Sequence, residues 1–163
     1  MPHSVPLTRY RSHLDYYDSG HHSYEQLFLA MRKLGLPQSA MEQQFRRVVF
    51  NVVGCNQDDH VKNFAFTMDR QGRWDLSPAY DLCHAEGSAF TSQHQLSLNG
   101  KTTGFTRADL KSLAGYADLP RGRYSQVLEE VCDQFASWKD LPSARCLPSS
   151  LRKQVERTLR LSW

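Results

Sequence analysis

Hydrophobic residues begin to recur at helical spacing only after a polar N-terminal stretch. Residues 1–22 are polar and broken by prolines, so we expect a segment that either packs across the domain or stays partly disordered. Ser23 and Gln26 then have the spacing of a capping box, which predicts the start of a helix. The stripe that predicts the body of this helix, which ends at Gly35, consists of Leu27, Met31 and Leu34.

A second apolar stripe predicts a longer, buried helix. Pro37 separates it from the first helix, Ser39 and Glu42 have capping-box spacing, and Gly54 is a typical residue at a helix end. The apolar positions between them are Met41, Phe45, Val48, Val49 and Val52. This helix leads directly into residues 55–63, which are polar and show no periodicity.

Short β-structure is predicted after the polar loop. Residues 64–67 and 74–76 flank the turn-rich segment 69–73, which is the pattern of a β-hairpin. Pro78 ends the hairpin, because proline cannot donate a hydrogen bond to a paired strand. One further alternating piece, 95–98, lies in an otherwise irregular stretch.

Three more helices are predicted in the C-terminal half. Thr106 with Asp109 starts the first of them and Pro120 opens the second. Their apolar positions are Leu110, Leu113 and Ala114, then Tyr124, Val127, Leu128, Val131 and Phe135, and for the last helix Leu151, Val155 and Leu159. The expected fold is mainly α with a small β-hairpin, as one domain over residues 23–163 behind the N-terminal segment 1–22.

Composition indicates the expected cellular compartment but does not identify a binding partner. The 163 residues include 20 basic and 17 acidic side chains spread along the chain, without a one-sided excess. The first twenty residues contain no apolar run, so we expect no signal peptide, no membrane span and a cytoplasmic protein. Four cysteines form no Cys-x-x-Cys pair and are expected to be reduced thiols: Cys55, Cys83, Cys132 and Cys146.

Asp58, Asn63 and Asp81 stand in the order that phosphoryl transfer requires. Protein kinases place a catalytic Asp and a magnesium-binding Asn five residues apart on one loop, followed by a hairpin and a second magnesium-binding Asp. Asp58 would accept or orient the proton of the attacking hydroxyl. Asn63 and Asp81 would hold Mg²⁺ against the phosphates of ATP, because this ion prefers oxygen ligands.

Three neighbours of these residues are candidates for roles in the same chemistry. Asp59 is the weaker candidate for the base, since adjacent side chains on an extended loop tend to point in different directions. His60 is predicted to steady the loop or to contact phosphate. Lys62 is predicted to neutralise the transferring phosphoryl group.

Two strings around these residues resemble the catalytic core of HipA-type toxin kinases. They are residues 56–66 (NQDDHVKNFAF) and residues 72–81 (GRWDLSPAYD). Residues 23–27 (SYEQL) and 96–101 (LSLNGK) are also similar to the C-terminal lobe of that family. The resemblance extends over roughly residues 10–160.

This resemblance implies a protein-kinase-like C-terminal lobe, the HipA C-terminal domain, of a serine/threonine protein kinase that uses ATP and Mg²⁺. It implies that Asp58 is the catalytic aspartate, that Asn63 and Asp81 bind magnesium, and that His60 is an active-site neighbour. It further implies a protein substrate, such as an aminoacyl-tRNA synthetase, and restraint by a HipB-like antitoxin. The sequence contains no glycine-rich phosphate loop, so we expect an N-lobe on the same or a separate chain.

Two other functions fit parts of the pattern. The chain could be a truncated, inactive lobe that acts as a binding module, because half of the nucleotide site is missing. A small-molecule kinase of the aminoglycoside or choline type has a D-x-H-x-x-N loop, which Asp58, His60 and Asn63 also satisfy. Those enzymes usually carry histidine where this chain has Asn56, which favours the protein kinase.

Other residue clusters have simpler interpretations. Cys55, His60, Cys83 and His84 lack the spacing of a zinc site, so small buried thiols and a loop histidine are favoured. Several histidines lie in polar stretches and are predicted at the surface: His3, His13, His21, His22 and His94. The basic residues of 152–160 predict a solvated helix face, so no direct nucleic-acid contact is expected.

Overall fold

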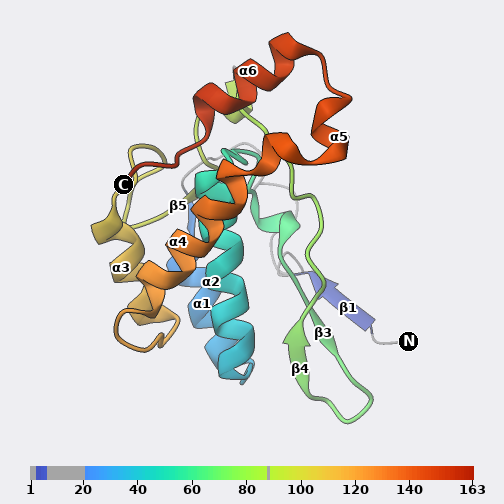
Figure 1. Ribbon diagram of the computed structural model, residues 1–163. Helices are drawn as coiled ribbons and strands as arrows, with labels where there is room; N and C mark the ends of the chain where they lie inside the picture. The colour runs from blue at the N-terminus through green and yellow to red at the C-terminus, as the bar shows by residue number, and fades with distance from the viewer. Residues whose placement is uncertain (1–2, 7–20, 88) are drawn as a thin grey trace.

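Two long helices, α2 and α4, lie side by side at the centre of the protein (Figure 1). The computed structural model describes residues 3–6, 21–87 and 89–163, with the backbone alone for 3–6. The helices are α1 (Tyr24–Lys33), α2 (Gln38–Val53), α3 (Arg107–Tyr116), α4 (Arg123–Ala136), α5 (Pro142–Arg145) and α6 (Ser149–Thr158). Short 3-10 helices are η2 (Val61–Asn63), η3 (Ala89–Ser92) and η4 (Trp138–Asp140). The prediction of a mainly α fold is confirmed.

The start of α1 follows the sequence rule, whereas the start of α2 does not. The Ser23 side chain accepts a hydrogen bond from the backbone of Gln26, whose own side chain accepts from the Ser23 backbone, so the first capping box is confirmed. The predicted box of Ser39 and Glu42 is wrong. Helix α2 begins at Gln38 without a side-chain cap. The Glu42 carboxylate instead binds the guanidinium of Arg123 on α4, at 2.7 Å.

The strands form two small sheets. Strands β3 (Ala65–Met68) and β4 (Trp74–Leu76) make the predicted antiparallel hairpin, and β1 (His3–Pro6) pairs antiparallel with the other edge of β3. Residues 3–6 of the N-terminal segment therefore belong to this sheet, while residues 1–2 and 7–20 lie outside the described part. Strand β5 (Leu96–Ser97) pairs in parallel with β2 (His22–Ser23), which the sequence did not predict.

The three predicted C-terminal helices correspond to α3, α4 and α6, but α4 differs from the prediction at its start. Thr106 and Asp109 form the expected capping box of α3. Helix α4 begins at Arg123 rather than at Pro120, because Gly122 adopts a left-handed conformation with φ of 83° directly before it. The short helices η4 and α5 between α4 and α6 were not predicted.

The core lies where α1, α2, α3 and α4 meet. The predicted stripe of α2 is fully buried at Val48, Val49 and Val52. Gly54 ends this helix and allows a close approach, since a Cβ atom there would lie 2.5 Å from the Phe135 ring of α4. Other large side chains of this core are Tyr24, Phe28, Met31, Phe45, Leu98, Leu110, Leu113 and Leu128.

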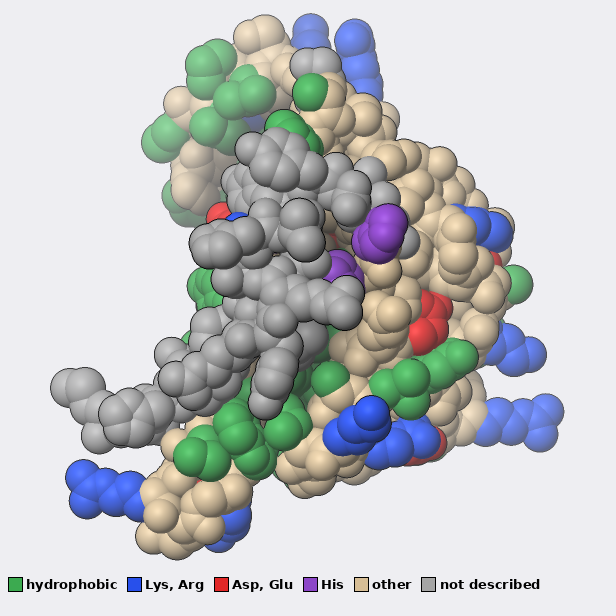
Figure 2. All heavy atoms as spheres, turned by 180° about the vertical axis from the view of Figure 1, so that it is seen from behind, with side chains coloured by type: hydrophobic (Ala, Val, Ile, Leu, Met, Phe, Trp, Pro, Cys, Tyr) green, Lys and Arg blue, Asp and Glu red, His purple; other side chains and the backbone are tan. Residues whose placement is uncertain are grey.

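The surface is mixed in character. Figure 2 shows hydrophobic side chains gathered at the end that carries α5 and α6, and Lys and Arg side chains standing apart near the edge of that face. Leu141 and Leu151, at that end of the molecule, are 55% and 40% exposed. Among the described residues, no helix is long and apolar enough to cross a membrane.

Gln44 on α2 is an exception to the apolar core. Its side chain is completely buried, and neither amide atom has a hydrogen-bond partner among the described residues. An unsatisfied buried polar group costs about 1–3 kcal/mol. We therefore expect Gln44→Leu to raise the free energy of unfolding by about 1 kcal/mol, measured by urea denaturation. The adjacent, exposed Gln43→Leu is the matched control, and an equal gain there would contradict the explanation.

Asp109 gives the fold a pH dependence. Its buried carboxylate accepts hydrogen bonds from Asn99, the Lys101 ammonium and Thr106. Burial by itself raises the pKa of Asp109, but these hydrogen bonds outweigh it and hold the pKa well below its usual range. The stabilisation is thus present above the unfolded pKa near 4 and is lost as the pH falls toward the lower folded pKa.

We expect Asp109→Asn to be less stable than the wild type at pH 6, with the difference shrinking as the pH is lowered to about 3. Chemical denaturation at both pH values measures this change. The exposed Asp133→Asn is the control and should alter stability little at either pH. A difference for Asp109→Asn that stays constant with pH would exclude Asp109 as the source.

Candidate active site

Two loops carry the predicted site residues and are joined by backbone hydrogen bonds. The first loop, residues 54–60, follows α2, and the second, residues 77–85, follows β4. The Gln57 amide donates to the Ala85 carbonyl at 2.9 Å, and the Ala85 amide donates to the Cys55 carbonyl at 3.1 Å. This short parallel pairing sets the distance between the loops.

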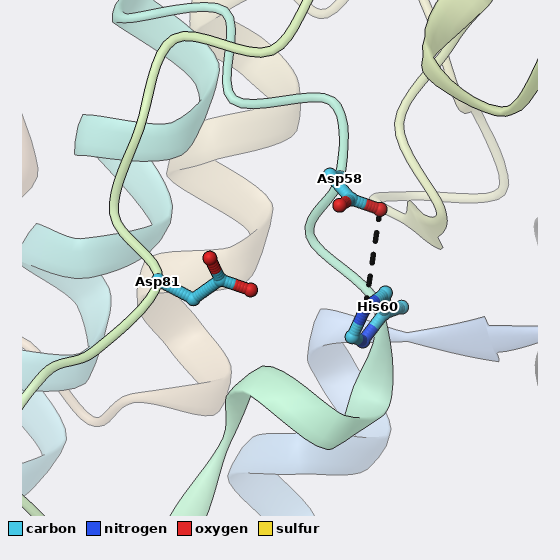
Figure 3. Close-up of side chains that lie close together, drawn as sticks. All are labelled: Asp58, His60 and Asp81. Carbon is cyan, nitrogen blue, oxygen red and sulfur yellow. Dashed lines mark ion pairs between the residues drawn. The ribbon is translucent and has the colours of Figure 1, made fainter.

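Asp58, His60 and Asp81 converge from these loops. Each offers one ligand atom, and the three atoms all lie within 4.8 Å of one another. Figure 3 shows Asp58 and His60 on the loop that leads into η2, with the Asp81 carboxylate pointing toward them from the opposite segment. The His60 Nε2 atom lies 3.9 Å from an Asp58 carboxylate oxygen. Two carboxylates so close together favour a bound cation, because their charges otherwise repel each other.

Asn63 is linked to the cluster of Asp58, His60 and Asp81 by a hydrogen bond to the Asp58 backbone. Its side-chain nitrogen donates to the Asp58 carbonyl at 2.9 Å, which leaves the side-chain oxygen as a possible ligand. Asn63 and Asp81 also line one small pocket, together with Arg47 and Tyr80. The residues present thus fit a magnesium ion, which prefers carboxylate and amide oxygens. The Lys62 carbonyl accepts a hydrogen bond from the hydroxyl of Tyr80, one of the residues that line this pocket, at 2.7 Å.

Asp59 points the opposite way from Asp58. Its carboxylate is fully buried and accepts hydrogen bonds from the Tyr24 hydroxyl, His94 Nδ1 and the Gln95 backbone amide. Asp58 is 42% exposed by comparison. The expectation that the two neighbours diverge is therefore confirmed, and Asp59 anchors the loop from the inside.

A chain of buried amides continues from Asp59 to the second loop. Asn51 donates to the Tyr24 oxygen at 3.2 Å, and Asn56 donates to the Asn51 side-chain oxygen at 3.1 Å and to the Asp81 carbonyl at 3.3 Å. Asn51 and Asn56 are each 2% exposed. The backbones that carry Asp58 and Asp81 are thereby held by one polar network through the core.

Comparison with known proteins places this arrangement in a family. The sequence model of the HipA-like C-terminal domain matches residues 5–139, which is most of the chain. The chain belongs to the HipA-like C-terminal domain family. A search of curated proteins found no match.

A solved structure supports the fold of this HipA-like domain. It is the toxin-antitoxin complex of HipA, HipB and operator DNA from Shewanella oneidensis MR-1, with a TM-score of 0.65 and 22% sequence identity. The alignment covers 83% of this chain and 33% of the other chain. The chain thus spans about a third of the length of that relative, and at this identity the likeness shows the fold alone.

The structure corrects two predictions around the HipA-like site. His94 is not a surface residue: it is 2% exposed, and its ring bonds to Asp59. Cys83 is not a buried thiol but is exposed. His21 is exposed as predicted and His22 is half-buried, whereas His3 and His13 have no described side chains.

The cysteines are reduced and are not part of the candidate metal site. All four cysteines are free thiols, as expected. The described residues contain one group of His, Cys and acidic side chains close enough to share a metal ion, namely Asp58, His60 and Asp81, and no cysteine belongs to it.

The sequence contained one overlooked signal of the buried network. Asn51 interrupts the apolar stripe of α2 between Phe50 and Val52, and a polar side chain inside such a stripe must find a partner in the core. Nothing local identifies that partner as Tyr24, which lies on another helix. His94 carried no comparable signal, because its neighbours in the sequence are polar.

Tyr24 offers a direct test of the network. Burial raises the pKa of Tyr24 well above its usual value, and the Asp59 charge raises it further, so the hydroxyl remains a donor. We expect Tyr24→Phe to lower the free energy of unfolding by about 1–3 kcal/mol, because the buried Asp59 carboxylate and Asn51 amide each lose a partner. Thermal and urea denaturation measure the loss. Tyr116→Phe, at an exposed tyrosine of α3, is the matched control and should be nearly neutral; equal effects would argue against the network.

Proposed function

We propose that this chain is the catalytic lobe of a HipA-like serine/threonine kinase, which transfers the γ-phosphoryl group of ATP to a protein hydroxyl. The observation that carries the proposal is the convergence of Asp58, His60 and Asp81, with ligand atoms within 4.8 Å of one another. The Asp81 carboxylate and the Asn63 amide are of the ligand types that magnesium-dependent phosphoryl transfer uses, and Asp58 lies beside them as the proposed base. Membership of the HipA-like family favours this activity over that of a small-molecule kinase.

Each residue has a defined task in the proposed reaction. Asp58 accepts or orients the proton of the substrate hydroxyl, whose oxygen attacks the γ-phosphorus while the bond to the leaving ADP breaks. Asn63 and Asp81 would hold Mg²⁺. When bound, this ion neutralises charge on the phosphate oxygens. Asp58 is partly exposed and therefore accessible to a substrate, whereas Asp59 is buried and cannot reach the substrate hydroxyl.

His60 and Lys62 have supporting roles in the proposal. His60 lies beside Asp58 and directly before η2, and its proposed role is to steady the loop or to contact phosphate. Lys62 is proposed to neutralise the transferring phosphoryl group, as cations do in such sites. Burial raises the pKa of Tyr80, and the Asp81 charge raises it further, so its hydroxyl stays a donor to the Lys62 carbonyl.

Partners are required to complete this activity. The proposal includes an N-lobe, on the same or another chain, that supplies the glycine-rich phosphate loop and the adenine site. A HipB-like antitoxin is the proposed regulator, by analogy with the Shewanella complex of HipA and HipB. The proposed substrate is a protein, of which an aminoacyl-tRNA synthetase is one example, and the proposed location is the cytoplasm.

Substitution of the two aspartates tests the proposed chemistry. In the kinase completed by its N-lobe, we expect Asp58→Ala and Asp81→Ala each to lower phosphotransfer about a thousandfold or more. Both side chains are solvent-accessible, so the thermal midpoint should change little. Transfer of labelled phosphate from ATP to protein is the measurement. The exposed Asp133→Ala on α4 is the control and should retain activity.

The same assay separates the competing functions. Full activity in both aspartate variants would refute the assignment of Asp58 and Asp81. Labelling of a small molecule in place of a protein would favour a kinase of the aminoglycoside or choline type. Failure of the completed wild-type protein to transfer phosphate, with retained binding of a protein partner, would favour an inactive binding module.

A further inference from the structure

The C-terminal segment Thr158–Trp163, which we call the C-terminal strap, lies against both loops of the candidate site. It begins at the last residue of α6, a helix that crosses the end of the molecule above α2 and α4 (Figure 1). It also lies beyond residue 139, where the match to the HipA-like domain ends. The family comparison therefore assigns it no role, and its contacts have to be explained from the structure.

Thr158 contacts both loops. Its backbone carbonyl accepts a hydrogen bond from the Cys55 thiol at 2.7 Å, and its hydroxyl lies 2.7 Å from His84 Nε2. The hydroxyl donates its own proton to the Val155 carbonyl at 2.9 Å, so it acts as the acceptor for a protonated His84 Nε2. Cys55 precedes Asp58 by three residues and His84 follows Asp81 by three. The two contacts thus flank the backbone pairing that sets the distance between the loops.

Arg160 anchors the strap to the core. Its backbone amide donates to the Val53 carbonyl at 2.9 Å, which satisfies the last turn of α2 directly before the first loop. Its guanidinium donates to the Phe105 carbonyl at 2.7 Å and lies 4.9 Å from the centre of the Trp163 ring. The Trp163 indole in turn donates to the Arg160 carbonyl at 2.8 Å. Arg160 therefore fixes the strap at both its backbone and its side chain.

We propose that the C-terminal strap positions the two loops of the site, with Thr158 as the positioning residue and Arg160 as its anchor. A docked strap stabilises the pairing of Cys55 and Gln57 with Ala85, and so stabilises the arrangement in which Asp58 faces Asp81. A divalent cation held by Asn63 and Asp81, next to Asp58, favours the same arrangement. Strap docking and cation binding therefore strengthen each other, since coupling between two sites is reciprocal. The coupling between the strap and the cation rests on the proposed function, whereas the positioning of the loops does not.

Two local probes report on the strap without any ligand. The amide protons of Gln57 and Ala85 report on the loop pairing by hydrogen exchange, and the buried Cys55 thiol reports by its rate of alkylation. Thr158→Val removes the acceptor for His84 at nearly constant volume, whereas Thr158→Ser retains a hydroxyl. Arg160→Ala removes the anchor, and Arg157→Ala, at an exposed arginine of α6, is its matched control.

We expect Thr158→Val and Arg160→Ala to raise both exchange at Gln57 and Ala85 and alkylation of Cys55 by at least about fivefold. Thr158→Ser and Arg157→Ala should stay near the wild type. The exposed Cys146 serves as an internal reference in each sample. Rates that do not change between 0 and about 1 M urea would identify a local opening in place of global unfolding. Unchanged rates in both Thr158→Val and Arg160→Ala, or increases that follow global stability alone, would overturn the proposal.

Titration with Mn²⁺, followed by electron paramagnetic resonance, tests the coupling. The wild type should bind the ion, Asp81→Asn should not, and Thr158→Val should bind it at least about fivefold more weakly. In the wild type, Mn²⁺ should also slow alkylation of Cys55. Equal affinity of the wild type and Thr158→Val would overturn the coupling. Absence of binding to the wild type would instead count against the proposed metal site, while the rates at Gln57, Ala85 and Cys55 would still decide whether the strap positions the loops.

Discussion

The buried carboxylate of Asp59 is the interaction on which the rest of the site depends. Burying a charged group costs free energy unless the group is hydrogen-bonded. The Asp59 carboxylate accepts hydrogen bonds from Tyr24, His94 and the Gln95 amide. These three partners come from α1 and from the residues before β5. One side chain thereby joins the loop after α2 to two parts of the domain that are distant in sequence. Because each of its bonds is directional, the loop has little freedom to rotate.

The orientation of Asp58 follows from this anchor. With Asp59 held inward, the preceding side chain faces the second loop, where Asp81 approaches it. Cys55 and Asp81 both have positive φ angles, of 52° and 54°, which cost free energy for residues other than glycine. The amide chain of Asn51 and Asn56, together with the backbone pairing at Ala85, supplies interactions that hold these conformations. The convergence of the two aspartates is thus maintained by the core rather than by the loops themselves.

Such an arrangement suits a catalytic lobe that works with a partner. The groups that would hold a metal ion are half-buried or exposed, while the groups that orient their loops are buried. The chain spans about a third of the length of the HipA relative. In the proposed function, an N-lobe would supply the rest of the nucleotide site. The C-terminal strap adds a support from the side of α2 and α6, beyond the residues that match the family. The residues that contact the loops thus include Tyr24 of α1 and Thr158 at the start of the strap.

The sequence by itself determined those features that depend on near neighbours. The capping boxes at Ser23 and Thr106, the buried stripe of α2 and the β3–β4 hairpin were all predictable, because each arises from residues within one short stretch of the sequence. It also supplied the order of Asp58, Asn63 and Asp81, whose chemical roles remain predictions.

Only the tertiary structure decided the features that need a distant partner. Glu42 could cap its own helix or bind Arg123, and the position of α4 selects the second. Strand β1 becomes the third strand of a sheet because β3 offers it an edge, and His94 is buried because Asp59 lies beside it. The physical reason is that local rules describe backbone geometry over a few residues, whereas charge pairing, burial and strand addition depend on which surfaces meet after the chain has folded.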